Sequence, residues 1–214
     1  MTAGQFFASI VCGLLASFLT QSIHAAQYMI DPARSQLVVQ LFKTGLGAGL
    51  AHDHVVAAKN YSGQIELDPK APTAAQIAVE VDATTLVVDD PEMRRKYNLP
   101  GGLSDDNRRE IQQTLESEGQ LYVRRHPKIR FRSKRITLEK EGQYIVTGDL
   151  ELRGVTQVVS LSVQAELHEP VLRAKGSGRF LQSSFGYRPY SAFWGTVRNQ
   201  DEVILHVDIV AVRQ

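Results

Sequence analysis

Strict alternation of apolar and polar residues is the feature of this chain that most constrains its fold. In one clear run, Ile129 and Phe131 are separated and flanked by lysine and arginine. A period of two places the two sets of side chains on opposite faces of a strand, which is typical of antiparallel sheets with one face in water. Runs of this kind cover residues 36–41, 77–82, 128–134, 159–164 and 203–210.

Weaker alternation extends the pattern to most of the chain. It covers residues 53–67, 143–152 and 171–182, which brings the expected strands to about eight. Arg153-Gly154, between two alternating runs, is typical of a hairpin turn. Eight antiparallel strands are enough to close a barrel around side chains or one ligand. We therefore expect an all-β fold, an eight-stranded antiparallel β-barrel in a single domain.

One stretch interrupts the strands with helix signals. Asp90 can cap a short helix that has Pro91 at its first position and Tyr97 near its end. Ser104 can cap a second helix that runs to about Ser117. A helical insertion of this kind can plug one end of a barrel or act as a lid, and the sequence leaves both roles open.

The first 25 residues differ from the rest. They contain no Asp, Glu, Lys or Arg, and an apolar stretch precedes small residues at Ala25 and Ala26. We interpret residues 1–25 as a signal peptide and 26–214 as the mature domain, periplasmic or secreted in a bacterium and not stably inserted in a membrane after cleavage. The only cysteine, Cys12, lies in the signal segment, so no disulfide is expected.

The charge balance and the missing motifs exclude several classes of function. The chain has 24 basic and 23 acidic residues, which does not predict a nucleic acid partner. The basic run from Lys128 to Lys134 is interpreted as a solvated strand face, because alternation directs it away from Phe131. No nucleophile elbow or spaced carboxylate pair is present, so no catalytic residue and no cofactor is predicted. The main prediction also includes no metal site, which enters only as the alternative described next.

His52-Asp53-His54 is the sharpest candidate for chemistry. In an extended strand, residues i and i+2 point to the same side, so the two imidazoles could share a metal ion. A metal site needs at least one further ligand, which no nearby motif supplies. The other interpretation is that the histidine nitrogens bond to backbone groups or to a ligand head group at the mouth of the barrel.

Aromatic residues gather in a short segment of the last third of the chain. Interspersed glycine and proline favour a pocket wall bordered by loops over a regular strand, although ordinary barrel core is the alternative. The segment contains Phe180, Phe185, Tyr187, Tyr190, Phe193 and Trp194.

Four segments resemble the YceI-like family of bacterial periplasmic or secreted proteins. They are Tyr28 to Ser35, Val123 to Ser133, Val146 to Thr156 and Ser184 to Gly186, and together they span nearly the whole mature chain. The resemblance implies a lipocalin-like barrel whose lumen accommodates isoprenoids or other long-chain amphiphiles, including quinone-like and prenyl-phosphate lipids. The chain departs from the family at Phe42-Lys43, where a histidine is often found, and in its longer 89–119 insertion.

These observations predict a non-enzymatic carrier that holds a long-chain lipid in the barrel lumen. The alternative is a metal-binding enzyme or redox accessory protein that uses His52 and His54. Pairing of two chains as a homodimer is left open. The expected ligand-binding residues are apolar wall residues and groups for the polar end: Phe42, His52, His54, Phe131, Phe180, Phe185, Tyr187, Phe193 and Trp194.

Overall fold

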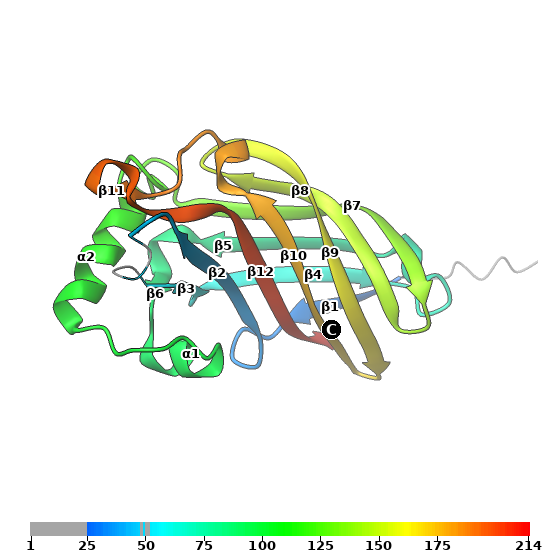
Figure 1. The fold of residues 1–214 in the computed structure, drawn as a ribbon. Helices are drawn as coiled ribbons and strands as arrows, with labels where there is room; N and C mark the ends of the chain where they lie inside the picture. Colours follow the sequence, from blue (N-terminus) through cyan, green and yellow to red (C-terminus); the bar gives the residue numbers. More distant parts are fainter. Residues whose placement is uncertain (1–24, 48, 50–51) are drawn as a thin grey trace, which may run out of the picture.

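The computed structural model describes residues 25–47, 49 and 52–214. The predicted signal peptide and Cys12 lie outside the described residues, apart from Ala25. Strands dominate the described part of the chain (Figure 1). They are β1 (Ala26–Ile30), β2 (Gln36–Thr44), β3 (His54–Ala58), β4 (Tyr61–Leu67), β5 (Gln76–Asp82), β6 (Leu86–Val88), β7 (Lys128–Lys140), β8 (Gln143–Leu152), β9 (Val155–His168), β10 (Val171–Leu181), β11 (Ser191–Ala192) and β12 (Val197–Arg213).

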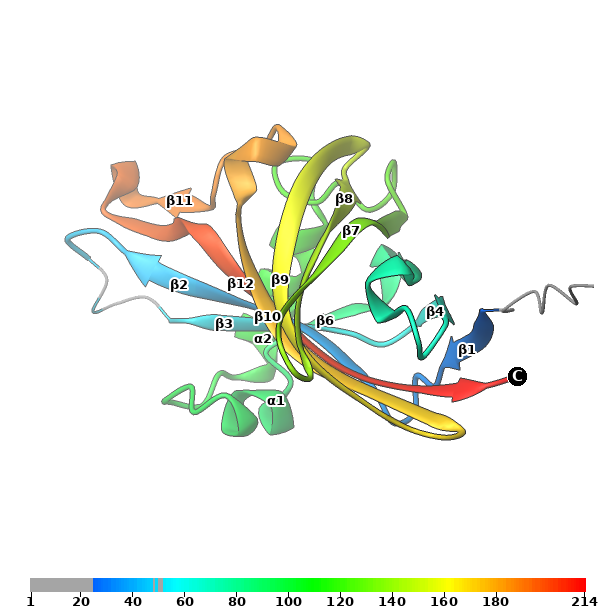
Figure 2. The same cartoon turned by 90° about the vertical axis from the view of Figure 1, so that its right-hand side faces the viewer.

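All of these strands belong to one antiparallel sheet that closes on itself. Within the described residues the ring runs β1-β4-β5-β7-β8-β9-β10-β12, and pairing of β1 with β12 completes it. The predicted eight-stranded antiparallel barrel is therefore confirmed. Figure 2 shows the closed sheet with the β9 and β10 arrows crossing its near side.

Three further strands extend the barrel at one end. β2 pairs with β12 between Arg198 and Asp208, β3 pairs with β2, and β6 pairs with β3. In sequence, β2 follows β1, β4 follows β3 and β6 follows β5, with two to five non-strand residues between the members of each pair, so each pair forms one interrupted strand path. With these pairs joined, every strand of the ring is hydrogen-bonded to its neighbours in sequence, as in an up-and-down barrel.

The alternation in the sequence matches the two faces of this sheet. The apolar residues of the predicted runs in β2, β5 and β12 face the barrel interior, and their polar neighbours face outward. The cations of β7 face outward as expected and pair with carboxylates on adjacent strands, for example Arg130 with Glu80 at 2.9 Å and Lys134 with Asp149 at 2.8 Å. The Arg153-Gly154 turn is confirmed, since both residues have positive φ and connect β8 to β9.

Glycines on the inner face allow the strands to bend closely past one another. A Cβ added to Gly176 in β10 would lie 2.3 Å from the Ser162 carbonyl oxygen, and one added to Gly148 in β8 would lie 2.6 Å from the Phe131 ring. Any side chain at these positions would collide with the adjacent strand or with a ring that lines the interior. These glycines therefore let the sheet curve without adding side chains to its interior.

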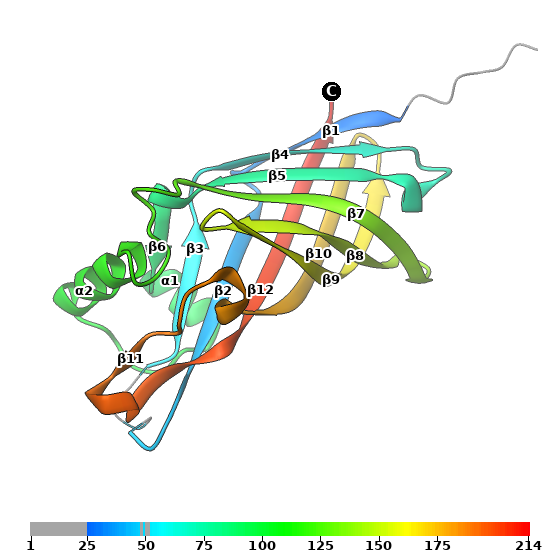
Figure 3. The same cartoon turned by 90° about the horizontal axis from the view of Figure 1, so that it is seen from above.

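The helical insertion has the predicted boundaries. α1 (Pro91–Lys96) is capped by Asp90, and α2 (Asp105–Glu116) is capped by Ser104, whose hydroxyl accepts a hydrogen bond from Asn107 N–H. α1 packs Met93 on the outer face of the β2 and β3 extension. α2 lies across the end of the barrel formed by that extension (Figure 3). No helix in the described ranges is long and apolar enough to cross a membrane.

Candidate ligand-binding cavity

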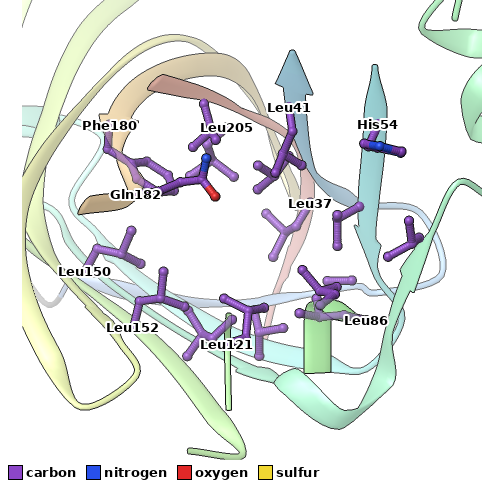
Figure 4. A pocket seen from close by; sticks show the side chains of 18 of the residues that line it. Leu37, Leu41, His54, Leu86, Leu121, Leu150, Leu152, Phe180, Gln182 and Leu205 are labelled. Carbon is purple, nitrogen blue, oxygen red and sulfur yellow. The ribbon is translucent and has the colours of Figure 1, made fainter. Parts of the chain in front are cut away.

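The interior of the barrel is hollow. A cavity of about 720 Å³ occupies it, and side chains from every side point toward the open space (Figure 4). The wall is mostly aliphatic, because most inward positions of the alternating strands are Leu, Val or Ile. Wall residues include Leu37, Val39, Leu41, Ile77, Val79, Leu150, Leu152, Leu161, Val163, Leu205, Val207 and Ile209. Binding pockets for small molecules have volumes of roughly 300–1,000 Å³, so this cavity is large enough to enclose a ligand.

Polar side chains collect at one end of the cavity. Four of those that line it are also exposed, so the cavity reaches solvent where they lie: His52, Asn107, Glu110 and Tyr190. They come from the segment before β3, from α2 and from the segment before β11. We call this end the mouth.

His54 presents a polarised imidazole at the cavity wall. Its Nδ1 lies 2.6 Å from Oδ2 of Asp89, which is completely buried. A carboxylate can only accept, so Nδ1 donates to it and carries the proton. The other ring nitrogen, Nε2, makes no hydrogen bond with any described residue. Nε2 can therefore form a hydrogen bond with a ligand group inside the cavity.

Asp89 is held as a buried anion by several donors. Its Oδ1 accepts hydrogen bonds from Val55 N–H at 3.1 Å and from the Arg94 guanidinium at 2.9 Å. Burial alone would raise the pKa of Asp89, but the hydrogen bond and charge of His54 and the hydrogen bonds from Val55 and Arg94 lower it below the usual value. The buried charge is thus paired on both oxygens, as burial of a charge requires.

Arg94 connects this pair to the loop after α1. Its guanidinium also donates to the carbonyl oxygens of Asp53 at 2.9 Å and Pro100 at 2.8 Å. The Nε of Arg94 is buried without a hydrogen-bond partner in the described structure. The network joins the segment before β3, the end of β6 and the insertion, so it fixes the ring of His54 against the wall.

α2 is attached to the barrel through the free edge of β6. The side-chain amide of Gln112 donates to the Leu86 carbonyl oxygen at 2.8 Å and accepts from Val88 N–H at 3.0 Å. These two hydrogen bonds to the β6 backbone replace some of the hydrogen bonds that a neighbouring strand would make. The same helix turns Ile111 and Leu115 toward the cavity. α2 therefore forms one wall of the mouth. The roles of plug and lid that the sequence left open stay predictions.

Tyr187 and Gln182 add polar atoms to the cavity wall. Burial raises the pKa of the Tyr187 hydroxyl, although the Arg153 cation, 5.3 Å from the ring centre, acts in the opposite direction. The phenol is therefore neutral at physiological pH and can donate a hydrogen bond. Gln182 is buried, and its amide donates to the Gln200 carbonyl oxygen at 2.8 Å.

Five of the nine predicted ligand-binding residues line this cavity: His52, His54, Phe131, Phe180 and Tyr187. Their contact with a ligand stays a prediction. The side chain of Phe193 lies outside the described part of the structure.

Three predicted residues are placed away from the cavity wall. Phe42 follows Leu41 in β2, and since Leu41 faces inward, Phe42 belongs to the opposite face. Phe185 is buried behind the wall, where it contacts Phe180 edge-to-face with ring centres 5.4 Å apart. Trp194 is wholly exposed to solvent. Phe42 and Phe185 were expected to line the lumen and Trp194 to meet the polar end of the ligand, but none of the three lines the cavity in the described structure.

The sequence interpretation did not identify Asp89, Arg94 or Gln112. Asp89 precedes the predicted helix cap, and nothing in its local sequence separates a buried carboxylate from a loop residue. No cluster of three His, Cys, Asp or Glu side chains suited to a metal ion occurs among residues 25–47, 49 and 52–214. The alternative of a metal site at His52 and His54 stays an untested prediction.

Comparison with known proteins places the chain in a family. The model of the YceI-like domain matches residues 28–211. The chain belongs to the YceI-like family. It is 25% identical over 162 residues to a UPF0312 protein of Shewanella sp. strain MR-7, an alignment that covers 75% of this chain and 72% of that protein.

Solved structures share the fold at lower identity. BcnA of Burkholderia cenocepacia is similar with a TM-score of 0.64 and 18% identity, over 86% of this chain and 99% of BcnA. The YceI protein of Campylobacter jejuni is similar with a TM-score of 0.55 and 15% identity, over 74% of this chain and 84% of that protein. The predicted family and barrel are therefore confirmed.

Asp89→Asn tests the buried network beside the cavity. We expect it to lower the free energy of unfolding by about 3–5 kcal/mol near neutral pH, because Arg94 loses its buried counter-charge. Asparagine has the same shape and tolerates the positive φ of 51° at this position. Chemical denaturation of both proteins measures the difference.

The same pair of proteins should show a defined pH dependence. The pKa of Asp89 is lower in the folded state than in the unfolded state, so its stabilisation is complete above the unfolded pKa of about 3.9 and is lost as pH falls through the folded pKa. The stability difference from Asp89→Asn should shrink below about pH 4. A difference that stays constant down to acid unfolding would contradict this assignment.

Gln112→Ala tests the attachment of α2. It leaves the Leu86 carbonyl and Val88 N–H without a partner, which costs about 1–3 kcal/mol for each group that stays buried. We expect faster amide hydrogen exchange in α2 and β6, with the barrel strands β8 to β10 unchanged. Gln113→Ala is the matched control, because Gln113 is the next residue and is exposed. Equal exchange in the two variants would show that Gln112 does not hold the helix.

Proposed function

We propose that this protein is a non-enzymatic binding protein for a long-chain amphiphilic lipid, such as a polyisoprenoid, a quinone-like lipid or a prenyl phosphate. The observation that carries the proposal is the cavity of about 720 Å³ with an aliphatic wall and polar groups at one end. Each methylene moved from water into such an interior contributes about 0.8 kcal/mol. A long apolar chain can therefore bind tightly without an ion pair.

The polar end of the ligand is proposed to lie at the mouth, beside His54 and Tyr187. In its neutral form the His54 imidazole accepts a hydrogen bond at Nε2, so it suits a hydroxyl group, and when protonated it can donate to a carbonyl or phosphate oxygen. The buried Asp89 keeps the ring in one orientation in both cases. Tyr187, which also lines the cavity, supplies a second donor.

A role outside the cytoplasm is part of the proposal. It is supported by the uncharged apolar segment at residues 1–25 and by the absence of cysteine from residues 26–214. In the periplasm or in secretion, a cavity of this kind would carry a water-insoluble lipid through the aqueous phase.

Organic extraction of freshly purified protein followed by mass spectrometry tests the proposal. We expect one lipid class in stoichiometric amount from the wild type and almost none from Phe131→Asp, because that change places a carboxylate on the cavity wall. Arg132→Asp is the control, since Arg132 is the next residue and is exposed.

A second variant keeps the wall apolar. Ala174→Phe adds a ring to the cavity and should reduce the retained lipid without introducing a charge. Equal lipid content in the wild type, Phe131→Asp and Ala174→Phe would show that the lipid binds elsewhere. A wild-type protein that carries no lipid and binds none when lipid is added would contradict the proposal.

A further inference from the structure

Two loops lie side by side beyond the mouth of the cavity. Gly47 N–H, in the segment after β2, donates to the Thr196 carbonyl oxygen at 2.9 Å, just before β12. Gly45 is so close that an added Cβ would lie 2.4 Å from the same oxygen. The two chain segments therefore form one packed projection, visible in Figure 3 where the ends of β2 and β11 point the same way. We call it the tip.

The tip carries the two most exposed large apolar side chains in the described part of the chain. Relative exposure is 102% for Leu46 and 105% for Trp194. The backbone of Trp194 has φ of 56° and ψ of 33°, in the left-handed region that few non-glycine residues adopt. Single exposed apolar residues are common on proteins, but a tryptophan and a leucine on adjoining loops form a surface that water solvates poorly.

The tip is continuous with the mouth. Tyr190 and Asn199 line the cavity, and Asn199 N–H donates to the Tyr190 carbonyl oxygen at 2.9 Å. Further from the cavity, the two residues of β11 pair with Val197 and Arg198 of β12. The tip lies directly beyond this strand pair. A flat surface that met the tip would therefore lie next to the opening of the cavity.

Exposed cations accompany the apolar side chains. Arg188 and Arg198 are exposed, and neither makes an ion pair within the described residues. Arg198 pairs with Ser191 in the strand at the base of the tip, and the Arg188 carbonyl oxygen accepts from Gln120, which lines the cavity. Tryptophan at the interface with flanking arginine is the combination that binds the head-group region of an anionic bilayer.

We propose that the tip docks on the surface of an anionic lipid bilayer, with Trp194 and Leu46 in the head-group region and the mouth beside the membrane. This inference rests on the proposed function, because a lipid cargo would then move between bilayer and cavity without crossing bulk water. Neither residue lines the cavity, so docking and lipid retention are separable by mutation.

Trp194 is the only tryptophan in the 214-residue chain, so tryptophan emission reports on the tip alone. We expect a blue shift and protection from acrylamide when phosphatidylcholine vesicles containing phosphatidylglycerol are added to the purified protein, and a weaker effect with phosphatidylcholine alone. In vesicle flotation, the double variant Leu46→Ser, Trp194→Ser should lose at least about tenfold in binding. Its lipid content by extraction should equal that of the wild type.

The control variant is Leu138→Ser, Val158→Ser, because these side chains are 55% and 60% exposed and lie on β7 and β9, outside the tip. Wild-type emission that does not respond to vesicles, or double-variant flotation equal to wild type, overturns the docking proposal. An emission shift that depends on protein concentration without vesicles also overturns it, since a second copy of the chain then covers the tip. A wild type that docks but carries no lipid contradicts the proposed function instead.

Discussion

Closure of the sheet by β12 is the constraint on which the rest of the structure depends. β12 has 17 residues and pairs with β10 along one edge, while its other edge pairs with β2 and then β1. Once the sheet is closed, every second residue of each strand faces inward, and the alternation in the sequence becomes an apolar lining. Inner glycines such as Gly176 let the strands curve without filling the interior. The lining therefore surrounds a cavity and does not form a solid core.

The same closure explains why the polar side chains that line the cavity lie at one end of the barrel. Among the described strands, none pairs with the outer edge of β6, and the segment between β6 and β7 lies against it through α2. Gln112 bonds to the backbone of that edge, and Arg94 and Asp89 fix the approach to α1. His54 thus stands at the boundary between aliphatic wall and solvent. This arrangement suits an amphiphile, which has one apolar and one polar end.

Local patterns in the sequence were sufficient to predict the barrel and its helices. Alternation identifies the inward residues of β5 and β12, and Asp90 and Ser104 mark both helix starts, because these features depend only on neighbouring residues. Alternation alone did not predict the breaks that divide the long strand paths, although Asp31-Pro32 lies in the first of them. The sequence also did not predict which way side chains point in the irregular segments. Phe185 lies in a 3₁₀ turn and Trp194 has a left-handed backbone, so aromatic composition alone could not show which way either ring points.

The buried network was missed for a different reason. Asp89, His54 and Arg94 come together only when β3 pairs with β6 and α1 folds back against them. A charged residue in a loop sequence is ordinarily solvated, and only the tertiary structure shows that this one is buried and paired. His52 and His54 were recognised as a pair, yet the structure gives them different surroundings. His54 is bonded to a buried carboxylate, whereas His52 is exposed at the mouth.

In the proposed function, burial of an apolar chain in the barrel drives binding. The decisive experiment measures affinities for a series of single-chain amphiphiles with one head group and increasing chain length. Affinity is expected to rise about fourfold with each added methylene, until the chain fills the cavity and the affinity levels off. Affinities that follow the head group and do not change with chain length would contradict it.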